Sequence, residues 1–453
     1  MKRFFTIPRV LVLSFASVIA LGALTLTASF SAARGVAPHT FIDSLFMSTS
    51  AVCVTGLTVL DSGRQYSPFG QAALLGLIQV GGLGILTFSN LLILARFGRI
   101  GLRERQILGE THGGLPHISA ASLLLKVMSY TFVIESLGAA LLTARFARDY
   151  PFAKALWLGV FHSVAAFCNA GFSLFTDNLM RYYGDWIVNL TIMSLIVLGG
   201  LGFIVFADLG FWTRERSRIP RPRLSLHSKT VIATTAILIV TGAAAVFLLE
   251  WRGSALKGSL VDRVTESFFI SITARTAGFN TTDTAQLTNA TLLAVILLMF
   301  IGASPGSTGG GIKTTTCAIL FAMLISRGRN RPKVELMKRS IPMETVAKAL
   351  ATFFGFAAVM LAGVVLLQIT ELTGQPAAQH RGKFIEHLFE VVSGMGTVGL
   401  STGVSPTLTS AGKLVIIGCM FLGRLGPVLV ATSLIGERRR LEYSYPEERL
   451  IVG

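Results

Sequence analysis

Four short segments of the chain repeat one pattern, and this repetition constrains the fold more than any other feature. In each segment a glycine is followed by Leu or Phe and then by a small polar residue, as in Gly399-Leu400-Ser401. A phenylalanine precedes every one of these glycines by ten residues, which leaves room for a short helix between them. The aligned glycines are Gly56, Gly171, Gly278 and Gly399, and the phenylalanines are Phe46, Phe161, Phe268 and Phe389. The pattern predicts four copies of one helix-and-loop unit.

The residues before each glycine have the composition of a cation-selectivity filter. Backbone carbonyls from four converging segments can replace the water around a dehydrated ion. Neighbouring carbonyls point the same way only if some residues adopt backbone angles that side chains resist, and glycine adopts them without a Cβ clash. The preceding short helix would direct its partly negative C-terminal end at the ion. The candidate ion-binding residues are Val54, Thr55 and Gly56; Asn169, Ala170 and Gly171; Thr276, Ala277 and Gly278; and Thr397, Val398 and Gly399.

The composition is typical of a polytopic membrane protein. Of the 453 residues, 52% are hydrophobic and only 14% are charged. The net charge of +17 would suit nucleic-acid binding, but the basic residues cluster between apolar stretches, which is the positive-inside pattern. We therefore expect these clusters and both termini in the cytoplasm, and no nucleic acid. The clusters are Arg96 to Arg105, Arg214 to Lys229, Arg327 to Arg339, and Arg438 to Arg440.

An apolar stretch precedes and follows each filter segment, which predicts eight spans. Val10 to Phe30 also has the features of a signal peptide, but it is the only candidate span before the first filter segment, so we keep it as a helix. The repeats comprise residues 1–97, 98–213, 214–325 and 326–435, with a cytoplasmic tail at 436–453. The expected fold is an all-α membrane protein of eight transmembrane helices and four re-entrant pore helices, with pseudo-fourfold symmetry. The later spans are Phe69 to Leu94, Ser119 to Phe146, Ile187 to Trp212, Thr230 to Leu249, Leu292 to Ile325, Met343 to Ile369, and Lys413 to Leu434.

The second span of each repeat carries an aligned cluster of small residues, at 81–84, 199–202, 302–305 and 423–426. Close helix packing explains most of these glycines. In the third repeat, five glycines and Pro305 between Gly302 and Gly311 should break the helix. Irregular backbone at membrane depth must be buried in protein or line a watery cavity, so we place this stretch beneath the filter. The candidate gate residues are Gly302, Pro305, Gly306, Ser307, Thr308, Gly309, Gly310, Gly311, Lys313 and Arg424.

Two features of this group need separate interpretation. Residues 306–314 resemble a phosphate-binding loop, but Ile312 separates the last glycine from Lys313 and no strand precedes it, so nucleotide binding is disfavoured. Arg424 replaces the second glycine of the fourth cluster, and a charge at that depth is a functional candidate by default. It would either oppose cations in the pathway or anchor the broken loop through its carbonyls, and the two roles are compatible.

Together, the four filter segments, the glycine-rich break and the arginine resemble the Trk/Ktr/HKT superfamily of potassium transporters over nearly the whole chain. With eight expected spans, the chain is most similar to the Ktr-type (KtrB-like) membrane subunit. The resemblance implies that Gly302 to Lys313 is a gating loop that Arg424 faces. It also implies selection of potassium, because relatives with serine at the position of Gly56 favour sodium.

The resemblance further implies a homodimer with one pore per protomer in the cytoplasmic membrane of a bacterium. A cytoplasmic ring of nucleotide-binding subunits, on a separate chain, would regulate it, and sodium stimulates uptake by some relatives. No covalent cofactor is expected, and the bound ion is potassium, with sodium as the alternative.

Two alternatives remain open. A sodium-permeable or weakly selective cation transporter is compatible with Asn169, Ala170 and Ala277, which depart from potassium-channel filters. A membrane-embedded enzyme would use Glu135, Asp208 or the glycine-rich loop, but no nucleophile and base stand together in the sequence. An enzyme also leaves the four aligned segments unexplained, so we expect none.

Overall fold

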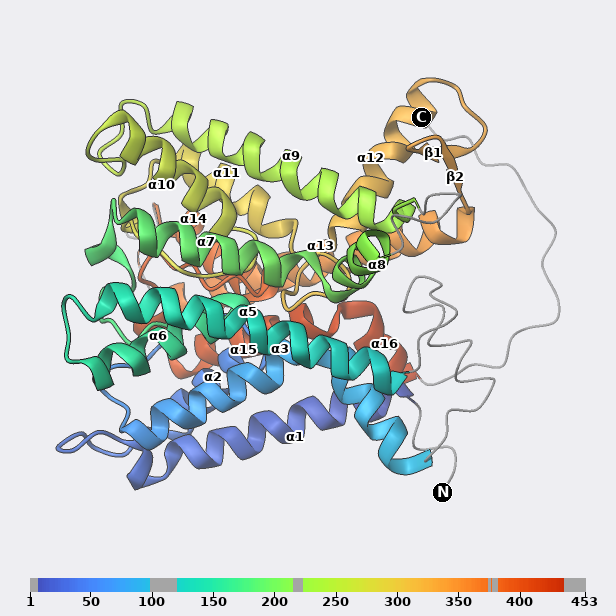
Figure 1. Ribbon diagram of the computed structural model, residues 1–453. Coiled ribbons are helices and arrows are strands. Elements are labelled where there is room, and N and C mark those ends of the chain that lie inside the picture. Colours follow the sequence, from blue (N-terminus) through green and yellow to red (C-terminus); the bar gives the residue numbers. More distant parts are fainter. Residues whose placement is uncertain (1–6, 98–119, 215–222, 374–375, 377–381, 436–453) are drawn as a thin grey trace.

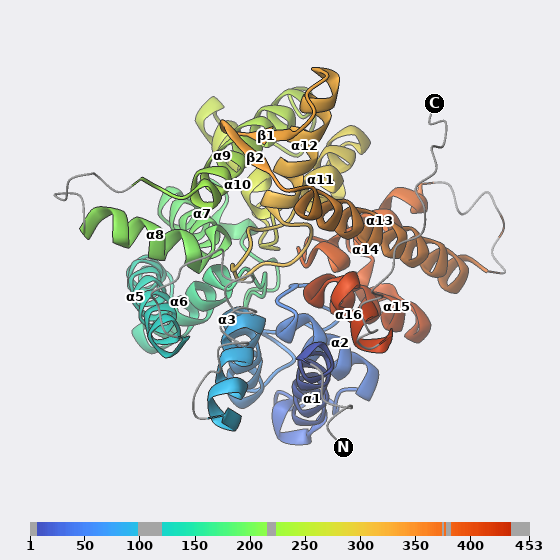
Figure 2. The same ribbon diagram turned by 90° about the vertical axis from the view of Figure 1, so that its right-hand side faces the viewer.

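The computed structural model describes residues 7–97, 120–214, 223–373, 376 and 382–435 (Figure 1). The predicted tail at 436–453 and most of the basic cluster at 96–105 lie outside the described residues, as does part of the cluster at 214–229. The fold is predominantly helical, as expected. In Figure 2 the repeats follow one another around a common centre, from blue α1 through green α7 and yellow α11 to red α15.

Each repeat begins with a long helix, followed by a shorter one that ends at a filter segment. The long helices are α1 (Ile7–Thr27), α5 (Ala120–Phe146), α9 (Leu226–Leu249) and α13 (Met343–Leu372). The shorter helices, here called pore helices, are α2 (Phe41–Val52), α6 (Phe152–Phe167), α10 (Leu260–Thr273) and α14 (Lys383–Gly396). Side-chain caps start two of the pore helices, since Thr40 accepts from the Asp43 amide and Ser259 forms a capping box with Asp262. The predicted order of a span, a pore helix and a filter segment is therefore present in every repeat.

The second span of every repeat is interrupted near its middle. These spans are α3 (Pro68–Phe97), α7 (Trp186–Leu201) with α8 (Phe203–Arg214), α11 (Asn289–Phe300) with α12 (Thr314–Gly328), and α15 (Ser410–Leu425) with α16 (Pro427–Ile435). The chain bends by 90° between α7 and α8 and by 92° between α15 and α16. Gly84 inside α3, Gly202 and Gly426 have φ of 79°, 90° and 87°. Each of the spans expected at 187–212 and 413–434 is therefore divided into two helices, because a glycine with positive φ ends the first helix at the aligned position.

The predicted spans meet tests of length and hydropathy to different degrees. In the described part of the chain, four helices are long and apolar enough to cross a membrane, namely the first helix of each repeat. The number rises to six when each sharply bent pair counts as one span. Large apolar side chains face outward on the long helices, including Leu21, Phe132 and Leu248 at 65%, 73% and 70% exposure. Such an outer surface fits a lipid environment.

A short hairpin joins the third and fourth repeats, where the sequence suggested only a basic loop. β1 (Val334–Leu336) pairs antiparallel with β2 (Arg339–Ile341). The two turn residues, Met337 and Lys338, have φ of 49° and 64°, as a tight turn of this hand requires. Val334 packs with Ala322 of α12 and Val346 of α13. The hairpin thus connects the end of the third repeat to the start of the fourth.

The aligned phenylalanines anchor three of the four pore helices. Phe46, Phe161 and Phe389 are fully buried, and each lies in a different apolar cluster. Phe268 is only partly buried, and the adjacent Phe269, 1% exposed, lies in the core instead. The marker that identified the repeats is therefore a packing residue, shifted by one position in the third copy.

Candidate ion pathway

The four filter glycines form a closed ring. A Cβ built on Gly56 would lie 2.9 Å from the Cα of Gly171, and one on Gly171 would lie 2.8 Å from the Cα of Gly278. A Cβ on Gly278 would lie 3.1 Å from the Cα of Gly399, and one on Gly399 would lie 2.8 Å from the Cα of Gly56. All four glycines have positive φ, between 66° and 96°. A side chain is therefore excluded from each position by its neighbour in the ring as well as by its own backbone.

The filter segments share an unusual backbone conformation. The residue two positions before each glycine is also left-handed, although none is a glycine. These residues are Val54, Asn169, Thr276 and Thr397, with φ of 54°, 58°, 77° and 51°. The residue between the two left-handed residues of each segment is not left-handed, so the sign of φ alternates along the segment. β-branched residues resist this conformation, and such strain collects at functional sites.

Hydroxyl groups of the pore helices hold the backs of the filter segments. The amide of Gly56 donates to the Ser50 hydroxyl at 3.0 Å, and the amide of Gly399 donates to the Ser393 hydroxyl at 3.0 Å. In the third repeat the Thr273 hydroxyl donates to the carbonyl of Phe279 at 2.6 Å. The two glycine amides therefore find partners behind the filter and not on its axis.

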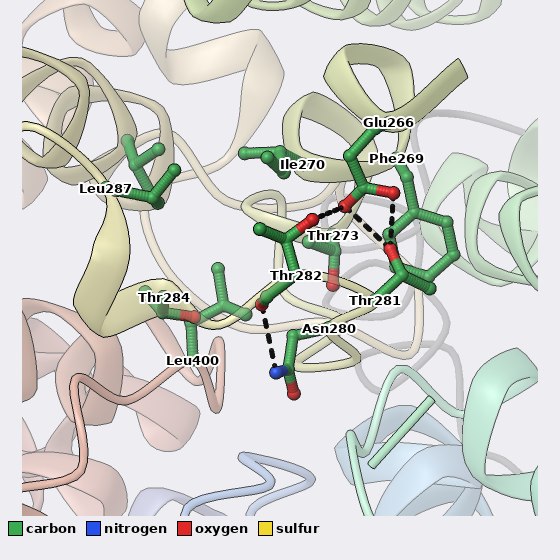
Figure 3. Close-up of a pocket in the computed structure, with 11 residues that line it drawn as sticks. Glu266, Phe269, Ile270, Thr273, Asn280, Thr281, Thr282, Thr284, Leu287 and Leu400 are labelled. Carbon is green, nitrogen blue, oxygen red and sulfur yellow. Dashed lines mark hydrogen bonds between the residues drawn. The ribbon is translucent and has the colours of Figure 1, made fainter. Parts of the chain in front are cut away.

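A buried ionisable side chain also holds the outer end of three filter segments. Glu266, 1% exposed, accepts from the hydroxyls of Thr281 at 2.7 Å and Thr282 at 2.5 Å, and Figure 3 shows both threonines pointing at the carboxylate. Fully buried Glu390 accepts from the hydroxyls of Ser401 and Ser405. Neither glutamate is among the site residues predicted from the sequence.

In the second repeat a histidine takes this place. The Nε2 atom of His162 lies 2.9 Å from the hydroxyl of Ser173, two residues after the filter glycine. A usable sequence signal was an ionisable residue nine positions before the filter glycine (His162, Glu390) or twelve positions before it (Glu266), combined with a hydroxyl residue shortly after that glycine.

The broken segment of the third repeat, here called the intramembrane loop (residues 301–313), lies against the inner ends of the filter segments. A Cβ on Gly309 would lie 2.2 Å from the Thr276 hydroxyl, and the amide of Gly310 donates to the Thr397 hydroxyl at 2.9 Å. The side-chain amide of Asn169 donates to the Thr308 hydroxyl at 3.0 Å. Three of the four filter segments therefore contact this loop through their left-handed residue.

The intramembrane loop also binds the break in the second repeat. The amide of Ser304 donates to the carbonyl of Gly200 at 3.1 Å, and the amide of Phe203 donates to the carbonyl of Gly306 at 2.9 Å. A Cβ on Gly202 would lie 2.6 Å from the carbonyl oxygen of Pro305. Two irregular segments, from different repeats, thus satisfy one another's backbone groups at a depth where water is scarce.

The other predicted loop residues give the intramembrane loop its shape. Its two ends are joined, because the amide of Gly302 donates to the carbonyl of Ile312 at 2.9 Å. Gly306 and Gly311 have φ of 70° and 68°, which permits two reversals of the chain. The Ser307 hydroxyl donates to the carbonyl of Ser304 at 2.6 Å.

Arg424 connects the intramembrane loop to two other repeats. Its buried guanidinium donates to the carbonyl of Thr308 in the loop and to the carbonyl of Gly81 in α3. Lys313 donates to Gly309 and Gly310 at 2.8 and 3.5 Å, so its bonds remain within the loop. Undocking of the loop would therefore break the bond from Arg424 to Thr308, whereas it would break neither bond of Lys313.

The filter segments offer an ion neutral oxygen atoms, in their backbone carbonyls and in the side chains of Thr55, Asn169 and Thr276. Among the described residues, no group of three or more His, Cys, Asp or Glu is placed to hold a metal ion. The filter segments offer carbonyls in a ring, which suits a weakly held monovalent cation better than a resident divalent metal.

Comparison with known proteins agrees with this geometry. The family model TrkH, described as "Cation transport protein", matches residues 9–441. The chain is 37% identical to the Ktr system potassium uptake protein B of Bacillus subtilis, over 99% of this chain and 97% of that protein. It is 36% identical to the potassium/sodium uptake protein NtpJ of Enterococcus hirae, over 97% and 95% of the two chains.

A solved structure gives the same fold. The crystal structure of the potassium transporter TrkH from Vibrio parahaemolyticus matches with a TM-score of 0.69 at 20% identity, over 94% of this chain and 83% of that one. The family and these relatives are transporters and not enzymes, so the enzyme alternative is set aside. From the family match over nearly its whole length, this chain belongs to the TrkH family of cation transport proteins.

Proposed function

We propose that the chain takes up potassium across the cytoplasmic membrane of a bacterium, down the electrochemical gradient, through the ring of filter segments. The observation that carries the proposal is the ring itself, because four glycines with positive φ leave no side chain between the converging backbones. In this proposal the carbonyls of residues 54–56, 169–171, 276–278 and 397–399 replace the hydration shell of the ion. The potassium uptake named for the Bacillus subtilis relative supports the choice of ion.

We propose further that the intramembrane loop is the gate and that Arg424 holds it closed. The loop contacts the inner ends of three filter segments, and the arginine ties it to α3 and α15. Movement of the loop would open a path below the filter, whereas the docked loop and the fixed positive charge oppose passage of a cation. Residues Gly302 to Lys313 and Arg424 are the gate in this scheme.

The proposed assembly is a homodimer in the lipid bilayer, with both termini in the cytoplasm and a nucleotide-binding regulatory ring on a separate chain. The clusters of basic residues between the spans support the orientation. The match to a Ktr potassium uptake protein over its full length supports a Ktr-type system, which sodium would stimulate. Cysteine accessibility from each side of the membrane tests the orientation, and mass measurement in detergent tests the dimer.

The second candidate is a transporter that carries sodium as well as potassium. Asn169 supports it, because an amide side chain bonded to Thr308 stands where potassium-channel filters have threonine. The relative named as a potassium/sodium uptake protein also supports it.

Cation uptake into proteoliposomes that contain the purified chain tests both candidates. Potassium, rubidium, sodium and lithium are compared under an imposed voltage, with empty liposomes as the control. Uptake that favours potassium and rubidium supports the first candidate, and equal sodium uptake supports the second. Absence of uptake by the chain alone and together with a cytoplasmic regulatory subunit refutes both.

A further inference from the structure

A small cavity lies behind the third filter segment, between the second and third repeats. Helices α7, α9 and α10, which lie side by side (Figure 1; Figure 2), contribute most of its lining. Its aliphatic walls include Ile196, Val197, Ile239 and Ile272. The volume of the cavity is about 10 Å³. The cavity therefore accommodates one small occupant.

Arg275 brings an unpaired positive charge to this cavity. The residue follows α10 directly, three positions before Gly278, and is 7% exposed. Its Nε atom has no hydrogen-bond partner, and within the described ranges its guanidinium makes no ion pair. The aligned positions of the other repeats hold Cys53, Cys168 and Gly396, none of which carries a fixed charge. A buried charge without a counter-charge is strongly unfavourable, so something must compensate for it.

Thr235 of α9 supplies a second unpaired polar group to the same cavity. It is 5% exposed, and its hydroxyl has no hydrogen-bond partner among the described residues. Buried hydroxyls normally have a hydrogen-bond partner, and a buried hydroxyl without one is unfavourable. The two unpaired side chains line one space, which points to an occupant that accepts hydrogen bonds from both.

The chemistry of the lining identifies the class of occupant. Arginine has only donors, so the occupant must be an acceptor, and its charge must be negative to balance the guanidinium. No carboxylate of the described residues forms an ion pair with Arg275, so these residues supply no counter-charge. Sulfate and phosphate are strongly hydrated, and the aliphatic walls cannot replace their water. We propose that the cavity binds one small monovalent anion of the size of chloride, held by Arg275 and Thr235.

The bound anion acts as a counter-ion for the third filter segment. Without it, the charge of Arg275 lies close to Thr276 and Gly278, where its field opposes a cation on the filter axis. With it, the local charge is balanced, and the guanidinium is held in one position behind the segment. The anion is thus a structural part of a cation pathway and is not itself transported.

Bromide provides the direct test, because it substitutes for chloride and scatters X-rays anomalously. Crystals of the full-length protein grown in bromide should show an anomalous peak in the cavity between α7, α9 and α10. The Thr235→Val variant preserves the size of the side chain and removes the hydroxyl, so the peak should fall markedly. A wild-type cavity without an anomalous peak, or an unchanged peak in Thr235→Val, would overturn the proposal.

Thermal unfolding gives an independent readout in solution. A ligand that binds only the folded state raises the unfolding temperature with concentration. Replacing gluconate by chloride at constant potassium should therefore raise the unfolding temperature of the wild type, and about tenfold more chloride should be required in Thr235→Val. The control is Thr131→Val in α5. Thr131 precedes Gly138 by seven residues, as Thr235 precedes Gly242, and both glycines face a pore-helix serine.

The control variant has no arginine beside it, because the second repeat carries Cys168 at the position of Arg275. Its chloride response should match that of the wild type. If gluconate and chloride stabilise the wild type equally, or if both valine variants lose the response to the same extent, the anion site is refuted.

Discussion

Arg424→Ala provides the strongest test of the proposed gate. The guanidinium donates two hydrogen bonds to carbonyls of other repeats. The bond to Thr308 joins the intramembrane loop to α15, and the bond to Gly81 joins α3 to α15. A hydrogen bond to a charged group contributes about 1.5–3 kcal/mol, and undocking of the loop breaks only the bond to Thr308, so Arg424 stabilises the docked loop by about 1.5–3 kcal/mol. At 1.4 kcal/mol per factor of ten, its loss shifts the equilibrium between docked and undocked loop about ten- to a hundredfold towards the undocked state.

The assay is rubidium uptake into proteoliposomes under an imposed voltage, with the amount of inserted protein determined for each variant. We expect uptake to increase, by less than the shift in equilibrium, because flux saturates once the loop is mostly undocked. Lys313→Met is a comparison within the gate: the bonds of Lys313 stay within the loop and do not depend on docking, so uptake should rise less than in Arg424→Ala. Arg424→Lys retains the charge but has no planar fork to bridge two carbonyls, so it separates the electrostatic effect from the anchoring effect. Unchanged or reduced uptake by folded, inserted Arg424→Ala would refute the gate.

Three further perturbations test other parts of the pathway. Gly56→Ser places a Cβ 2.5 Å from the Ala170 carbonyl oxygen, on a residue with φ of 96°. The ring must distort to admit it, so the permeability ratio of potassium to sodium should fall. An unchanged ratio would show that this glycine does not determine selectivity. Deletion of Gly306 to Gly310 should increase rubidium uptake, and lower uptake by folded protein would count against an occluding loop. Glu390→Gln weakens the hydrogen bonds from the hydroxyls of Ser401 and Ser405, so selectivity should fall. The control is Glu386→Gln, four residues earlier on α14, which should have a smaller effect. Equal effects would exclude a role for Glu390 in positioning the filter segment.

The ring of four glycines was predictable from the sequence because its constraint is local. A ring of four converging backbones admits only glycine at Gly56, Gly171, Gly278 and Gly399, so the requirement is visible in each segment separately. The break in the third repeat was predictable for the same reason, since Pro305 and clustered glycines cannot continue a helix. In both cases the residues that determine the local conformation lie within one short stretch of the sequence.

The breaks at Gly202 and Gly426 could not be predicted in this way. A glycine that permits close helix packing and a glycine with positive φ are identical in sequence, and only the tertiary environment distinguishes them. Gly202 is left-handed where Pro305 and Gly306 of another repeat pack against it. The bonds of Arg424 to Thr308 and Gly81 likewise depend on the assembled repeats, so the sequence indicated an anchor without its partners.

The closure of the glycine ring has a consequence for biosynthesis. Gly399 contacts Gly56, so the filter is completed between the first and the last of the four segments to leave the ribosome. A nascent chain that has inserted only three repeats lacks the fourth filter segment, so its ring of glycines is open. If the ring is the proposed filter, selectivity is acquired in one late step, after most of the chain is already in the bilayer. In such a molecule the surfaces of repeats one and three that normally contact repeat four are exposed. A quality-control system that detected these surfaces would recognise unfinished molecules before they could leak ions.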